Sequence, residues 1–175
     1  MKPLILFFAA VLFLSCTAVQ FEQPQPTDLA ALNEFPENIW GTYISEDTDT
    51  LIVSRFEFHF LGDREIEFSH DLNSPESVLK KDGDHFILNL KNNDNWDVFP
   101  FRFEDDKLLV YYSCPTEEVE DLIADYRQTA SVKEVPDTYG NIDFYLLDPT
   151  PAQFRDLFQK NIFSDHLIFT RVKEE

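Results

Sequence analysis

Apolar and polar residues alternate along much of the chain, and this two-residue period constrains the fold more than any other feature. The runs at 56–60, 86–90 and 99–103 place phenylalanine or leucine at every second position. Successive side chains of a strand point to opposite faces, so each run predicts a strand with one buried face. The expected strands are 39–45, 50–54, 56–60, 65–68, 86–90, 99–103, 108–112, 142–147 and 166–172.

Short polar turns join these runs, and the turn containing Asp82-Gly83 carries a strong hairpin signal. Two segments follow a helical period instead. Thr116 can cap a helix over about 116–130, with acidic residues in its first turn. A capping Thr, a Pro at the first helical position and a Gln at the third predict a second helix over about 150–160. The fold class expected is mainly β (α+β): an antiparallel meander of about nine or ten strands with two packed helices.

The N-terminus has the layout of a secretory signal peptide. Lys2 precedes an apolar run from residue 4 to residue 14, and the run ends at Ser15-Cys16. This run is too short to cross a bilayer as a helix, which takes roughly 20 residues. The residues Phe13-Leu14-Ser15-Cys16 resemble the lipobox of bacterial lipoproteins. The alternative is an ordinary signal peptide that is cut near Ala18, with Cys16 discarded.

The lipobox resemblance implies where the protein resides. It implies that residues 1–15 are removed, that Cys16 is acylated and that the protein is anchored in the cell envelope by lipid. Thr17 after the cysteine favours the outer membrane over the inner membrane. Prolines at 24, 26 and 36 predict that residues 16–36 form a flexible tether. Residues 37–175 then form a single domain.

The charge of the chain excludes one class of partner. Its 33 acidic residues against 14 Lys and Arg give a formal net charge of −19. Such a surface repels phosphates, so no nucleic acid partner is expected. The acidic surface keeps the protein soluble beside an anionic membrane, or alternatively recruits a cation or a basic partner.

Metal and catalytic motifs are weak. Glu46, Asp47 and Asp49 form the best calcium candidate, although hairpin turns favour Asp for conformational reasons alone. No nucleophile motif or phosphate-binding glycine loop is present, and no cofactor is expected. Cys114 is expected to serve as a small buried hydrophobe; the alternative, a nucleophile, lacks an identifiable base.

A second resemblance concerns the domain itself. Trp40-Gly41-Thr42-Tyr43 is similar to the Gly-x-Trp opening of lipocalin-like domains, and a helix followed by one last short strand also resembles their C-terminal layout. The resemblance implies a β-barrel that closes on itself. The alternative that the residues leave open is a partly open sheet or sandwich with helices packed on it.

The aromatic residues supply the candidate ligand site. The candidate ligand-binding side chains are Trp40, Tyr43, Phe58, Trp96, Phe101 and Tyr111. We expect a non-enzymatic envelope lipoprotein that binds a small apolar ligand or a protein partner. A small ligand requires a cavity lined by residues such as Phe56, Phe58, Phe86 and Phe101. The alternatives are an envelope hydrolase whose site is assembled only in three dimensions, and a purely structural lipoprotein.

Overall fold

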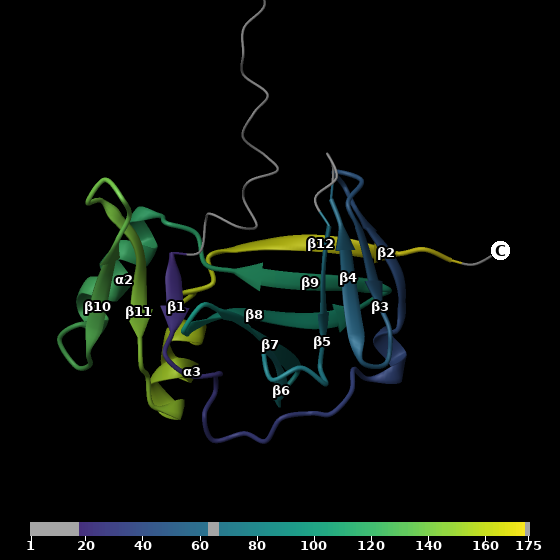
Figure 1. Cartoon of the computed structure of the whole chain (residues 1–175), viewed down its shortest axis with the longest axis horizontal. Helices are drawn as coiled ribbons and strands as arrows, with labels where there is room; N and C mark the ends of the chain where they lie inside the picture. The colour runs from purple at the N-terminus through teal and green to yellow at the C-terminus, as the bar shows by residue number, and fades with distance from the viewer. Residues whose placement is uncertain (1–17, 63–66, 174–175) are drawn as a thin grey trace, which may run out of the picture.

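The computed structural model describes residues 18–62 and 67–173 (Figure 1). It is predominantly β, with two α-helices and a short 3-10 helix, η1 (Glu37–Ile39), in those ranges. The strands are β1 (Val19–Phe21), β2 (Gly41–Ser45), β3 (Thr50–Val53), β4 (Glu57–Leu61), β5 (Glu67–Asp71), β6 (Ser77–Asp82), β7 (His85–Asn92), β8 (Asn95–Glu104), β9 (Lys107–Tyr112), β10 (Val132–Pro136), β11 (Ile142–Leu147) and β12 (Asp165–Arg171). The helices are α2 (Glu117–Tyr126) and α3 (Pro151–Gln159). The predicted mainly β class with two helices is confirmed.

The strands pair into one mixed sheet of 12 strands. Its main path is β10-β11-β1-β8-β9-β12-β2-β3-β4-β5, and β6 pairs with β7, which pairs with β8. Two antiparallel meanders, β2 to β5 and β6 to β9, agree with the prediction. The meander is interrupted, however, because β12 lies between β9 and β2, and β1 lies between β11 and β8 with a parallel pairing to β11. In the described ranges the pairings trace an open path, as in the open-sheet alternative.

The predicted tether is wrong for the described part of residues 16–36. Ala18, Val19 and Phe21 are buried, and β1 pairs with strands on both sides. Farther along, Gln25 and Phe35 are also buried. Proline-rich composition rules out a long helix, but an extended segment can still pack when apolar residues alternate within it. The predicted signal peptide and Cys16 lie outside the described residues.

Polar groups fasten the N-terminal segment to the sheet. Lys80 on β6 donates from Nζ to the carbonyls of Pro24 and Pro26, at 2.9 and 2.8 Å. Asn89 on β7 accepts from the Gln25 backbone N–H at 2.6 Å and donates to the Gln25 carbonyl at 3.0 Å. Buried backbone groups need such partners, so these side chains replace the strand pairing that prolines cannot supply.

Two hydrophobic clusters lie on opposite faces of β7 and β8. Ile87 and Val98 belong to the cluster that holds β1 and both helices. Leu88 and Phe101 belong to the cluster that faces β2 to β5. Figure 1 shows the same division, with the helices at one end of the molecule and β2 to β5 at the other. The central strands are therefore covered on both faces.

Both helices begin as predicted. Thr116 accepts a hydrogen bond from the Val119 N–H, and Thr150 forms a capping box with Gln153. α2 ends at Tyr126, earlier than the predicted residue 130, because residues after it turn toward β10. Neither helix in the described part of the chain has the length and apolarity to cross a membrane.

The packing of β1 generates a stability prediction. Phe21 is 0% exposed, so Phe21→Ala is expected to lower the free energy of unfolding by about 3–5 kcal/mol. Phe56→Ala is the matched control, because Phe56 is 38% exposed and its cation–π contact with Arg55 contributes about 1 kcal/mol or less. Urea unfolding followed by circular dichroism measures both. Equal losses in the two variants would contradict the place of β1 in the core.

Candidate functional site: a phenylalanine-lined cavity

A cavity of about 300 Å³ lies between the two layers of the curled sheet. One wall comes from β3, β4 and β5, and the other from β7, β8, β9 and β12. Alternate residues on a strand share a face, so β3, β4, β5, β8 and β9 each contribute side chains that are two positions apart. The apolar lining residues are Phe35, Ile39, Leu51, Val53, Phe58, Phe60, Phe68, Leu88, Leu90, Phe99, Phe101, Leu108, Val110 and Phe169.

Aromatic rings pack against each other across β4 and β5. The Phe60 and Phe68 rings stack with centroids 4.9 Å apart, and these residues are register partners. The Phe58 ring stacks on His70 at 5.6 Å, and this pair also faces across the two strands. Phe169 of β12 meets Phe60 edge to face at 6.4 Å. These contacts make a wall of rigid rings with few rotatable bonds.

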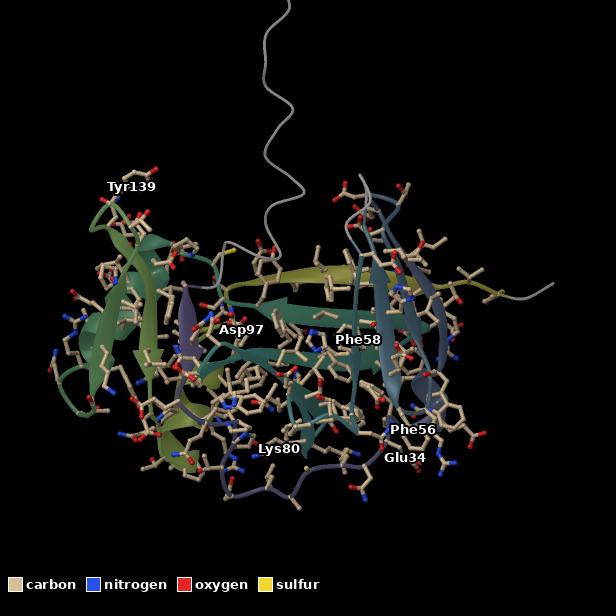
Figure 2. The ribbon with its side chains drawn as sticks, in the orientation of Figure 1. Glu34, Phe56, Phe58, Lys80, Asp97 and Tyr139 are labelled. Carbon is tan, nitrogen blue, oxygen red and sulfur yellow. The ribbon has the colours of Figure 1, made fainter. Side chains whose placement is uncertain are left out.

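Three polar side chains line the cavity near the β7–β8 turn. Asp97 accepts hydrogen bonds from Asn92 and from Gln20 of β1, each at 2.9 Å. Burial raises the pKa of Asp97, and the hydrogen bonds from Asn92 and Gln20 oppose that shift. Lys91 is exposed and lies over the Trp96 ring, 5.9 Å from its centroid. The cavity thus has an apolar body and a polar end, and Figure 2 shows Asp97 and Phe58 well separated across the centre of the molecule.

His70 is the titratable group within the aromatic wall. Its side chain is half-buried, and burial lowers its pKa below the ordinary value of 6.5, with Glu76 opposing the shift. Ser77 Oγ lies 3.3 Å from His70 Nδ1. The serine itself is buried and is not among the residues that line the cavity.

Two of the six predicted ligand residues, Phe58 and Phe101, line the cavity. Tyr43 and Trp40, from the N-terminal half of the domain, do not line it. Tyr43 is buried and donates its hydroxyl hydrogen to the Ile39 carbonyl at 2.8 Å. Trp40 donates from Nε1 to the Phe35 carbonyl at 2.8 Å. Both side chains therefore hold the loop before β2 in place.

Trp96 and Tyr111 also lie outside the lining. Trp96 pairs with Phe21 of β1, at the junction between β8 and the N-terminal strand. The Tyr111 ring contacts His85 at 5.9 Å and His166 at 5.8 Å, on the helix side of the sheet. The alternation of residues along a strand could not distinguish Trp96 and Tyr111 from cavity residues. That distinction requires knowing which hydrophobic cluster each face of β8 and β9 joins.

The expected cavity wall was partly correct. Phe56 and Phe86 do not line the cavity, because Phe56 is exposed and Phe86 stacks on Phe101 at 5.3 Å. Sequence reasoning missed five phenylalanines as site residues: Phe35, Phe60, Phe68, Phe99 and Phe169. Phe60 and Phe99 lie two positions from Phe58 and Phe101 on the same strands, so the phase of those residues was the signal that could have found these two.

Two other sequence predictions concern the calcium candidate in the 46–49 turn and the burial of Cys114. Within residues 18–62 and 67–173, no three His, Cys, Asp or Glu side chains form a metal-binding group, so Glu46, Asp47 and Asp49 are not assembled as the calcium candidate requires. The turn is held instead by a hydrogen bond from the Asp49 N–H to Ser45 Oγ, at 3.0 Å. Cys114 is half-buried rather than fully buried.

Comparisons with protein-family models, curated proteins and solved structures gave no match.

His70 generates a pH prediction. The unfolded chain protonates this ring at a higher pH than the folded protein does, because the folded pKa lies below 6.5. The contribution of neutral His70 to the free energy of unfolding is therefore fully present above pH 6.5. It is lost as the pH falls from 6.5 to the folded-state pKa. Burial lowers the pKa of His85 also, so both rings contribute in the same direction.

The measurement is the urea midpoint between pH 7.5 and pH 5. His70→Gln is expected to flatten this pH dependence, and His70→Gln combined with His85→Gln is expected to flatten it further. An unchanged slope in His70→Gln would contradict the burial of His70 in the cavity wall.

Proposed function

We propose that the chain is a non-enzymatic envelope lipoprotein, anchored through acylated Cys16, that binds a small apolar ligand between the layers of its sheet. The observation that carries this proposal is the cavity of about 300 Å³ with phenylalanine walls and a polar end. Ligand sites in proteins are mostly apolar, with a small number of polar groups that fix orientation.

The volume supports a ligand rather than a packing defect. Ligand pockets typically measure about 300–1,000 Å³, and the cavity lies at the lower end of that range. An engineered apolar cavity of about 150 Å³ already stays dry and binds benzene. A space about twice as large, walled by rings, suits a compact hydrophobic molecule or a short acyl chain.

The cavity also favours a small ligand over a protein partner. A protein partner predicts a filled core and recognition by an exposed patch. Here the interior retains space, which supports a small ligand. Lys91 and Asn92 are exposed where they line the cavity, so its polar end is the expected entrance.

A hydrolase is the second candidate, because Ser77 and His70 lie within contact distance. Their residue types match a nucleophile and its base. Ser77 is buried outside the cavity lining, however, so a ligand in the cavity does not reach its hydroxyl. We expect Ser77→Ala to bind the cavity ligand as the unmodified protein does. We also expect no difference between the two in esterase activity toward a p-nitrophenyl acyl ester.

A cavity-filling substitution tests the proposed function. Val110 lines the cavity on β9, so Val110→Phe is expected to weaken binding of the neutral dye N-phenyl-1-naphthylamine at least tenfold, because the added ring occupies the ligand volume. Dye fluorescence during titration measures the affinity, and circular dichroism verifies the fold.

Leu109→Phe is the matched control. Leu109 is the adjacent residue on β9, is half-buried and points to the opposite face of the strand, so its enlargement leaves the cavity unfilled. Equal dye affinity in the folded Val110→Phe and Leu109→Phe variants, or no dye binding by the unmodified protein, would contradict the proposal.

A further inference from the structure

The chain is already fixed in the domain at Ala18, two residues after Cys16. The Ala18 N–H donates to the Ser113 carbonyl at 3.2 Å, and its carbonyl accepts from the Tyr145 N–H at 2.9 Å. Ala18 is also buried. Both bonds join Ala18 to residues far away in the sequence, so Ala18 cannot leave its site without breaking them and exposing its buried side chain.

The distance from the domain to an acylated Cys16 is therefore short. Two extended residues span at most about 7 Å, so Cys16 lies within that distance of Ala18. A flexible tether of 21 residues, as predicted for 16–36, would have allowed the domain to stand well away from the bilayer. With β1 in the sheet, that separation is excluded for the acylated protein.

The turn between β10 and β11 projects beyond the start of β1. The parallel pairing of Val19 with Tyr145 places the beginnings of β1 and β11 at the same end of the sheet. Ala18 is level with Phe144, and Ile142 lies two residues, or about 7 Å, farther toward that end. Residues 137–141 form the turn beyond Ile142. The turn thus extends as far from Ala18 as the chain to Cys16 can reach.

Tyr139 is the most prominent side chain of this turn. It is 89% exposed, which is the largest exposure among the large hydrophobic residues of the described ranges. Figure 2 shows Tyr139 at the tip, whereas Phe56 and Glu34 lie at the opposite end of the molecule. Asp137 holds the turn: its Oδ1 accepts from the backbone N–H groups of Tyr139 and Asn141, at 2.7 and 2.9 Å. The Tyr139 ring is thus presented to solvent at the tip of the turn.

We propose that the 137–141 turn rests in the headgroup layer of the bilayer that holds the Cys16 acyl chains, with Tyr139 as its interfacial side chain. The ring of tyrosine suits this layer because it has an apolar body and a polar hydroxyl. The proposal rests on the lipid anchor in the proposed function and is independent of the cavity ligand.

The negative charge around the 137–141 turn determines which lipid headgroups fit it. Asp137 and Asp143 flank the tip, and the chain as a whole is strongly acidic. Anionic headgroups would repel these carboxylates, so the surface fits zwitterionic headgroups such as phosphatidylcholine or phosphatidylethanolamine.

Depth-dependent quenching tests the contact. The full lipoprotein, acylated in a bacterial host, is prepared in a Cys114→Ser background with one new cysteine, Tyr139→Cys or Phe56→Cys. Each is labelled with bimane and reconstituted into phosphatidylcholine vesicles that contain headgroup spin-labelled lipid. We expect at least threefold stronger quenching at position 139 than at position 56. We also expect quenching at 139 to disappear in the Cys16→Ser form added to the same vesicles.

Intact-mass measurement of each sample reports acylation. Acylated protein with equal quenching at positions 139 and 56 would overturn the contact and leave the lipid anchor in place. Protein without acyl chains on Cys16 would overturn both the anchor and the contact. Circular dichroism of the Tyr139→Cys and Phe56→Cys proteins verifies that both retain the fold.

Discussion

The insertion of β1 is the constraint on which the arrangement of the molecule depends. Its three residues pair with β11 on one side, and Phe21 pairs with Trp96 of β8 on the other, so the strand joins the helical end of the sheet to the central strands. Phe21 supplies the packing, with its ring 5.8 Å from Phe154 of α3 and 6.5 Å from Phe163. The same strand contributes Gln20, which donates to Asp97 at the polar end of the cavity. One short segment therefore connects the N-terminus, the helices and the candidate ligand site.

The cavity follows from how the central strands are covered. Each of β7 and β8 has one face against the helices and the other toward β2 to β5, as Ile87 and Leu88 show at neighbouring positions. Stacked rings form the wall on the side of β4 and β5, including Phe60 on Phe68, and Phe169 of β12 meets Phe60 edge to face. These side chains leave a space of about 300 Å³ between the layers. Lys91, Asn92 and Asp97 line the cavity where β7 turns into β8.

The parts of the fold that the sequence could predict were those determined by local patterns. Alternation located most strands of the two meanders, and capping residues such as Thr116 and Thr150 marked both helix starts. The place of β1 could not be predicted, because three residues between the predicted signal peptide and a proline-rich stretch carry too short a pattern. Phase identified Phe58 and Phe101, but the cavity depends on how strands far apart in the chain come to face each other. For the same reason Trp40 and Trp96 could not be distinguished from lining residues.

Native mass spectrometry of the protein purified from a bacterial host without added lipid or dye shows whether the cavity holds a ligand. The Cys16→Ser form cannot be acylated at residue 16, so it is purified without detergent, which keeps detergent out of the cavity. We expect an additional mass of a few hundred daltons that is retained under native conditions and lost on denaturation, and that is absent or reduced in Val110→Phe. A clean apoprotein mass that also fails to take up a short fatty acid or N-phenyl-1-naphthylamine would contradict a ligand-binding role for the cavity.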